Sequence, residues 1–193
     1  SDLDPAGDAF MPIATGHDGT LAYTTSQRFS ESRLAWVAAG QAPDPLPFPA
    51  RKYISLDMSP DGRALAAASL EAGRYEIRLL DLSRGTEQRL DLAGSNWTPR
   101  WNPRGGTLTY RSMRKGSFDV YQTDVAGGGQ EEPILTTEED EVPRAWSPDG
   151  RLLVYSTSQP DGSTHAKVLT IGEASTPSLV ATHSIDPADE SRD

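Results

Sequence analysis

Ser147-Pro148-Asp149-Gly150-Arg151-Leu152-Leu153-Val154-Tyr155-Ser156 is a turn sequence followed by an apolar run, and this pattern recurs along the 193-residue chain. The turn returns as Ser59-Pro60-Asp61-Gly62, in altered form as Asn102-Pro103-Arg104-Gly105, and in shortened form as His17-Asp18-Gly19. The glycines at positions 19, 62, 105 and 150 are separated by 43, 43 and 45 residues. Such regular spacing indicates four copies of one structural unit.

The chemistry of the turn explains why it should mark a hairpin. Proline fixes φ near −65°, aspartate accepts hydrogen bonds from nearby backbone amides, and glycine supplies a positive φ. Met58, Trp101 or Trp146 precedes each of the three longer turns, and a short apolar or alternating run follows it, as is typical of strands. We expect the three large residues to pack between units. The interval matches one blade of a β-propeller, so we predict an all-β fold with about four four-stranded antiparallel blades.

The repeat divides the chain into an N-terminal extension (1–10), four blades (11–49, 50–93, 94–138 and 139–183) and a C-terminal tail (184–193). Four prolines in 41–49 cannot donate to a ladder, so we expect an outermost edge strand or an extended connection there. Asp81 and Asp124 end equivalent strands and are expected to hold the turns that follow. The expected strands are 11–15, 20–25, 33–37 and 42–48; then 52–58, 63–69, 75–81 and 86–92; then 97–101, 107–112, 118–124 and 131–136; then 142–146, 151–157, 164–171 and 177–182.

Composition excludes several functional classes. The chain has 28 acidic and 18 basic residues and a net charge of −10, which argues against nucleic acid as a partner. Basic residues between 100 and 115 are interpreted as solvated hairpin tips. No cysteine is present, which excludes disulfides, thiolate nucleophiles and zinc ribbons. No apolar stretch is long enough to insert into a membrane. Because the chain begins at Ser1 without methionine, we expect a processed or excised piece.

Signatures of catalysis are missing. The sequence contains no nucleophile-elbow, phosphate-loop or metalloprotease pattern, and the glycines at 127–129 are expected to form a turn between strands. The histidines at 17, 165 and 183 lie near turns or strand ends. The acidic stretch 138–141 lacks the spacing of a calcium loop and is expected to be a solvated loop. We therefore expect no catalytic residue, no cofactor and no metal.

The repeats resemble the TolB-type β-propeller family, a WD-repeat-like class of propeller, over about residues 10–182. The resemblance rests on the turns 59–63 and 147–151 and on Asp81-Leu82-Ser83-Arg84-Gly85. More narrowly, the runs 18–23, 33–37 and 43–49 resemble the propeller tails of bacterial serine/threonine kinases, although no kinase motif is present. The resemblance implies a binding or scaffolding module outside the cytoplasm, periplasmic or extracellular. Composition alone leaves the cytoplasm open.

The resemblance also raises the question of ring closure. TolB-type propellers usually have six blades, whereas four are counted here. Three arrangements follow: a small closed ring, an open sector, or a larger ring completed by a second chain. Because an open sector exposes apolar blade faces, we favour self-association.

Three functions remain open at this point. The first is a non-catalytic module that binds a protein, a peptide or a small ligand; the others are a hydrolase, lyase or peptidase accessory domain, and a purely structural assembly domain. For a binding surface we select the blade entrances, where the loops before the innermost strands gather. Trp97, Arg100 and Arg144 are the candidate binding residues there, because arginine grips carboxylate or phosphate groups. The alternative is that these arginines pair with neighbouring acids inside the fold.

Overall fold

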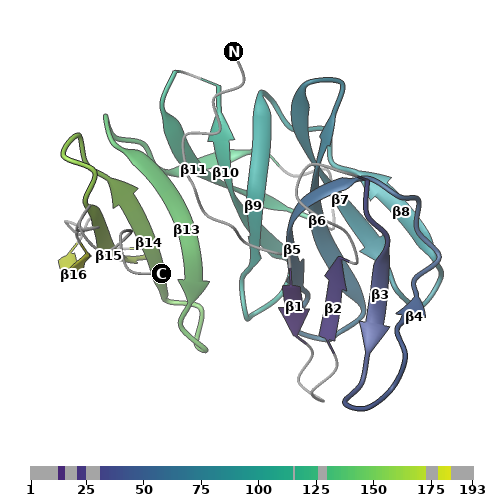
Figure 1. Cartoon of the computed structure of the whole chain (residues 1–193). Coiled ribbons are helices and arrows are strands. Elements are labelled where there is room, and N and C mark those ends of the chain that lie inside the picture. The colour runs from purple at the N-terminus through teal and green to yellow at the C-terminus, as the bar shows by residue number, and fades with distance from the viewer. Residues whose placement is uncertain are drawn as a thin grey trace, which may run out of the picture.

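The computed structural model describes residues 13–15, 21–24, 31–114, 116–125, 130–172 and 178–183, and within these ranges it contains strands and turns but no helix. The strands form four separate four-stranded sheets placed one after another along an arc (Figure 1). The all-β propeller architecture expected from the repeat is therefore confirmed. No helix in these ranges could span a membrane.

Each sheet is built from four strands that are consecutive in the chain and pair antiparallel. The first sheet comprises β1 (Ile13–Thr15), β2 (Leu21–Thr24), β3 (Leu34–Val37) and β4 (Asp44–Pro45), and the second comprises β5 (Lys52–Met58), β6 (Ala64–Glu71), β7 (Arg74–Asp81) and β8 (Thr86–Arg89). The third comprises β9 (Ser95–Trp101), β10 (Thr107–Met113), β11 (Phe118–Asp124) and β12 (Glu132–Leu135), and the fourth comprises β13 (Asp140–Trp146), β14 (Leu152–Ser158), β15 (Thr164–Thr170) and β16 (Ser178–His183).

The four sheets are the blades of an open arc. The first strands of successive blades contact one another in chain order, β1 with β5, β5 with β9, and β9 with β13. These strands therefore form the inner wall, and the fourth strands lie at the periphery. The first and fourth blades lie at opposite ends of the arc (Figure 1). The described residues of one chain thus form an open sector and not a small closed ring.

The proline-rich segment forms a very short edge strand. Only Asp44–Pro45 pairs, with Ala35 and Trp36 of β3, where the sequence suggested seven residues. Alternating prolines withhold the N–H groups that a longer ladder would need, so pairing stops after two residues. The expected outermost position of this strand is confirmed.

The repeated turns join the first and second strands of the blades, as predicted. In the second blade Asp61 Oδ1 accepts hydrogen bonds from Ser59 Oγ (2.7 Å) and from the Arg63 N–H (3.1 Å). Asp149 makes the same two bonds in the fourth blade, which keeps the pKa of both carboxyls below the usual value. In the third blade Asn102 Oδ1 takes over by accepting from the Arg104 N–H. The prolines and glycines of these turns serve the hairpins: Pro60, Gly62, Pro103, Gly105, Pro148 and Gly150. The three glycines have φ of 70°, 76° and 64°. Asp18 and Gly19 lie outside the described residues.

Asp81 holds its turn as expected, accepting from the N–H groups of Ser83 and Arg84. Asp124 ends the equivalent strand β11, but its role in the turn stays a prediction.

Apolar side chains are buried between blades rather than within one sheet. Met58 packs with the cluster between the first and second blades, Trp101 belongs to the cluster between the second and third, and Trp146 packs with the one between the third and fourth. The packing role predicted for these three residues is confirmed. In the middle cluster, the small Ala66 and Ala68 of β6 receive the large Trp101 and Tyr110 of the next blade. Neighbouring blades are thus complementary in shape.

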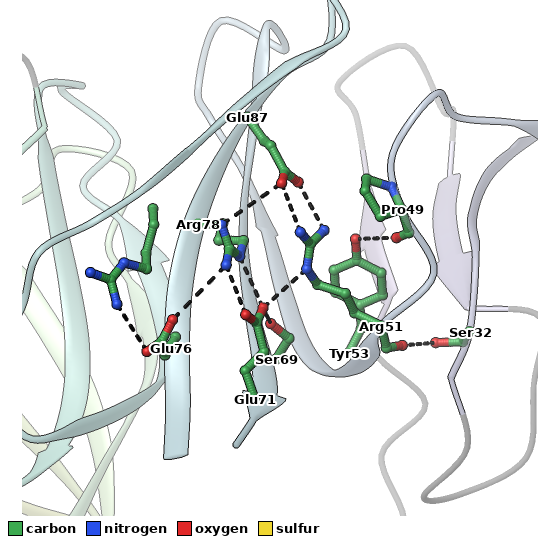
Figure 2. A network of polar contacts seen from close by, with 10 residues as sticks. Ser32, Pro49, Arg51, Tyr53, Ser69, Glu71, Glu76, Arg78 and Glu87 are labelled. Atoms are coloured by element: carbon green, nitrogen blue, oxygen red, sulfur yellow. Dashed lines mark hydrogen bonds and ion pairs between the residues drawn. The ribbon is translucent and has the colours of Figure 1, made fainter. Parts of the chain in front are cut away.

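A network of ion pairs links the crossover before β5 to β6, β7 and β8 of the second blade (Figure 2). Arg51 binds Glu71 through Nε (3.0 Å) and Glu87 through both Nη atoms (2.9 and 2.7 Å). Arg78 also binds Glu71, through Nε and Nη2 (3.0 and 2.8 Å). Glu71 therefore connects the crossover before β5 to β6 and β7. The hydrogen bond from Arg78 is the main cause that lowers the pKa of Glu71 to about 2.

Glu71→Gln is expected to destabilise the chain at pH 7 by about 1–2 kcal/mol, since the carboxylate is 29% exposed and solvent screens part of the effect. A carboxyl with a depressed pKa contributes stability above its unfolded value near 4.5, and this contribution is lost as the pH falls towards 2. The difference between variant and wild type should therefore shrink over that interval. Urea unfolding at several pH values measures it, with the exposed Glu31→Gln as control. An equal effect of both substitutions would contradict the role of the network.

Candidate functional site

Three strands of the inner wall, β5, β9 and β13, each contain an irregularity in their pairing with the next strand. The register shifts between Tyr53 and Ser55 in β5 and between Pro143 and Ala145 in β13. In β9 the shift lies between Trp97 and Arg100, opposite Tyr110 of β10. A bulge re-aims side chains and bends the strand. Thr98, within the β9 bulge, has a φ of 54°, a conformation that a β-branched residue rarely adopts.

Polar side chains on these inner strands bind the backbone of the next blade. The Thr98 N–H donates to Ser55 Oγ (3.1 Å), and the Trp101 N–H donates to Asp57 Oδ2 (2.6 Å). Arg100 Nε donates to the carbonyl of Arg144 (2.8 Å) in the fourth blade. Asp57 and Arg100 both stand two residues before their repeated turn, so one repeat position supplies the link at two successive junctions.

Arg100 is held mainly by backbone groups. Its Nη1 donates to the carbonyl of Pro99 (2.8 Å), in addition to the bond to Arg144. Burial lowers the pKa of Arg100, which the charge of Asp57 partly opposes and that of Arg144 reinforces. Burial also raises the pKa of Asp57, against the bond from Trp101 and the charge of Arg100. The two opposite charges therefore compensate each other within the wall.

Arg100→Met is expected to lower the free energy of unfolding by about 2 kcal/mol, because a side chain of similar length no longer donates to the two carbonyls. Chemical unfolding followed by tryptophan fluorescence measures the change. Arg151→Met, at an exposed arginine, is the matched control and should leave stability unchanged. An unchanged midpoint for Arg100→Met would show that the side chain does not brace the wall.

Trp97 packs in an aromatic group at the junction of the second and third blades. Its ring lies 4.8 Å from that of Tyr75 and 5.0 Å from that of Phe118, between ring centroids. The guanidinium of Arg111 stacks over Phe118 at 3.7 Å and lies 5.1 Å from the Trp97 centroid. This cation–π arrangement occupies the position that an external cation would need.

The predicted binding residues thus lie within the innermost strands, not in the loops before them. Trp97 and Arg100 belong to β9, and Arg144 belongs to β13, where its Nε donates to Ser156 Oγ (2.8 Å). Arg100 and Arg144 are brought together by the bond to the Arg144 carbonyl, while Trp97 contacts the aromatic group. Their role as ligand-binding residues stays a prediction.

A second set of buried polar groups anchors the crossovers between blades. Tyr53, Asn96 and Glu141 each stand six residues before a repeated turn and are 6%, 2% and 0% exposed. Each bonds to the chain that enters its own blade: Tyr53 to the carbonyl of Pro49, Asn96 to the carbonyl of Ala93, and Glu141 to the hydroxyl of Thr137. The same position thus carries a phenol, an amide or a carboxyl.

Glu141 is the exceptional member of this set, because a carboxyl replaces a neutral group. Burial raises the pKa of Glu141 to about 7; the Thr137 hydroxyl opposes the change, and the charges of Asp119 and Glu139 add to it. Oε2 of Glu141 and Oδ2 of the buried Asp119 have no hydrogen-bond partner in the described part of the chain. The expectation of a solvated loop at 138–141 is wrong for this residue, since Asp140 and Glu141 begin β13. The run of four acidic residues gave no sign that a strand begins within it.

A groove of about 850 Å³ lies between the second and third blades at the end that carries the repeated turns. Its lining includes the apolar Ala64, Leu79, Trp101 and Pro103, and Thr86, Glu87 and Gln88 of β8. Three arginines, Arg63, Arg84 and Arg104, also line it. Sequence analysis missed this groove, and the one available signal was arginine at position 104, where the second and fourth turns have aspartate. No group of three or more histidine or acidic residues able to hold a metal ion occurs in the described ranges.

Comparisons with known proteins support the fold. Residues 49–188 match the family described as the TolB beta propeller domain. A 103-residue stretch is 29% identical to the uncharacterized protein Atu1656 of Agrobacterium fabrum, covering 53% of this chain and 35% of that protein. The structure is similar to one of a protein assigned as TolB from Agrobacterium tumefaciens, with a TM-score of 0.76 and 19% identity over 89% of this chain and 64% of the other. It is also similar to TolB from Acinetobacter baumannii, with a TM-score of 0.70 and 20% identity over 83% and 40% of the two chains. The chain thus spans less than two thirds of each of these proteins.

Proposed function

Because this chain belongs to the TolB β-propeller domain family, we propose that it is a non-catalytic module that binds a protein or peptide and acts as a recognition or scaffolding part of a larger bacterial assembly. The observation that carries the proposal is how the polar groups are used. Asp57 and Arg100, two charged side chains of the inner wall, bind the backbone of the next blade, while the groove between the second and third blades is open. Charged side chains engaged in structural bonds, next to an open groove, suit ligand recognition better than catalysis.

The proposed place of action is outside the cytoplasm, in the periplasm or beyond, as the family resemblance implies. The proposed partner is a protein or peptide. Association with another copy is a second candidate, and one observation favours it: the first and fourth blades lie at opposite ends of the open arc, so within the described residues each packs against a neighbouring blade on one side only. Light scattering over a concentration series detects that association.

Selection from a displayed peptide library on the immobilised chain tests the binding function. We expect peptides that bind the folded chain and not the urea-unfolded chain, together with no turnover of a panel of peptide, ester and glycoside substrates. Turnover at enzymatic rates, or the absence of any fold-dependent binder, would contradict the proposal.

A further inference from the structure

We propose that the junction between the third and fourth blades is a proton-controlled hinge. While Glu141 is protonated, the fourth blade is docked at the end where β13 begins; when Glu141 is ionised, this end is released and the blade turns about the end that carries the repeated turns. The hinge goes beyond the proposed binding function and does not depend on it. It makes the shape of the arc responsive to the acidity of the surroundings.

The end of the junction that carries the repeated turns is suited to be the pivot. Arg104 Nε of the third turn donates to the carbonyl of Asp149 in the fourth (2.7 Å). Asn102 lies against Gly150, where an added Cβ would be 2.5 Å from Asn102 Oδ1. The acceptor of the arginine is a backbone carbonyl, so this bond does not depend on the ionisation of an acidic side chain. A pivot of this kind keeps the two blades together while their other ends separate.

The opposite end of the junction contains two buried carboxyl groups. The Phe118 N–H of β11 donates to Asp140 Oδ1 of β13 (3.1 Å), which joins the two blades there. The next residue on each strand is a buried acid, Asp119 (2% exposed) and Glu141 (0% exposed). Asp119 Oδ2 and Glu141 Oε2 have no hydrogen-bond partner among the described residues. Ionisation of both groups thus places two like charges, incompletely paired, beside one interblade hydrogen bond.

The charged groups nearest Glu141 oppose its ionisation. Burial is the main cause that raises the pKa of Glu141 to about 7; the Thr137 hydroxyl opposes this change, and the charges of Asp119 and Glu139 add to it. The Lys167 ammonium of β15 binds Glu139, so its positive charge is directed to that carboxylate. The surroundings therefore favour the neutral form of Glu141 in the docked state.

Other titratable groups lie on the strands of these two blades, namely Arg100 of β9, Arg111 of β10, Tyr155 of β14 and His165 of β15. Arg100 donates to a backbone carbonyl of β13, and Arg111 stacks over the Phe118 ring. Burial raises the pKa of Tyr155 to about 12, and the charge of Glu141 adds to this, so the phenol stays neutral. His165 stands in the same row of the sheet as Glu141, beyond Thr157, and therefore needs its own control.

Release of the blade exposes Glu141 to water, where a carboxyl has its ordinary pKa near 4.5. Since the pKa in the docked state is about 7, a rise in pH between these two values favours release, by up to about tenfold per pH unit. Below this interval the side chain is neutral in both states, and above it the effect is constant. Tyr53 and Asn96, at the equivalent positions of the second and third blades, are neutral, so the other two junctions lack this dependence.

Distance measurements between pairs of spin labels test the hinge. The chain has no cysteine, so labels attach only to introduced ones. Met113→Cys and Ser158→Cys place labels on the third and fourth blades at exposed positions, each eight residues after its turn glycine, Gly105 or Gly150. The control pair is Arg74→Cys with Met113→Cys, which reports on the junction between the second and third blades from two exposed positions.

Between pH 5.5 and pH 8 we expect the pair on the third and fourth blades to gain a longer-distance population, whose ratio to the shorter one rises at least about tenfold. The control pair should not change. Glu141→Gln should abolish the transition, and Asp119→Asn should reduce it because one of the two like charges is removed. The exposed Glu138→Gln is the matched control variant and should retain the full transition.

Distances that do not change with pH would overturn the inference, as would equal changes in both label pairs, which indicate a general loosening of the arc. Loss of the transition in His165→Gln, together with its retention in Glu141→Gln, would assign the proton to the histidine and reject the carboxyl hinge. Peptide selection on the folded chain decides the binding function separately. The hinge and the proposed function therefore fail by different results.

Discussion

Replacing Tyr110 with alanine is expected to lower the free energy of unfolding by about 4 kcal/mol. Tyr110 is completely buried at the junction of the second and third blades, in the cluster that contains Ala66 and Ala68 of β6. Because those neighbours are small, no adjacent side chain can expand to fill the space, and the cavity remains. Urea unfolding monitored by circular dichroism measures the loss.

Tyr110→Phe separates the ring from the hydroxyl group. The hydroxyl donates to Glu131 Oε2 (2.7 Å), and its removal should cost about 1 kcal/mol. Leu152→Ala, at an exposed apolar residue, is the control and should change stability by less than about 0.5 kcal/mol. If Tyr110→Ala behaved like Leu152→Ala, the blades would not be held together by this interface.

The second large effect concerns pH and Glu141. A carboxyl whose folded pKa is about 7, above its unfolded value of 4.5, is more protonated in the folded state. Its burial therefore costs little below pH 4.5, becomes increasingly destabilising between 4.5 and 7, and is constant above that interval. Glu141→Gln removes this cost, so at pH 8 the variant should be more stable than the wild type by about 3 kcal/mol.

At pH 4 the advantage of Glu141→Gln should disappear, because the wild-type side chain is then neutral as well. Unfolding midpoints measured from pH 4 to pH 8 give the full profile. Glu138→Gln, three residues earlier and exposed, should reproduce the wild-type profile. A stabilisation independent of pH would mean that shape, not charge, distinguishes the two side chains. The neutral Tyr53 and Asn96 at equivalent positions already illustrate the preference of this site.

Much of the fold was predictable because the turn sequence is chemically demanding. Pro60, Asp61 and Gly62 leave few conformations available, so counting between turns located the strand ends to within three residues. The main error in length was 42–48, where the proline alternation restricts pairing to Asp44–Pro45. The packing of Met58, Trp101 and Trp146 was predictable from their common phase.

The candidate sites were less accessible to sequence reasoning because they depend on pairs of residues from different blades. The link between Arg100 and the Arg144 carbonyl joins positions 44 residues apart and involves a backbone group, which has no sequence signature. Glu141 was misjudged because four consecutive acidic residues suggested solvent exposure, whereas the strand that begins at Asp140 buries Glu141 and the bend before this strand leaves Glu138 exposed. The groove is formed by two blades, and neither repeat alone indicates it.

Every sheet in this arc is completed by strands that follow one another directly in the chain. Pairings within a blade consequently have low contact order, and each blade can form its ladders as soon as its own forty or so residues have emerged during synthesis. Docking of the next blade then covers the apolar face left by the previous one. The fold is therefore suited to vectorial assembly, in which the blades of a nascent chain fold one after another from the N-terminal end.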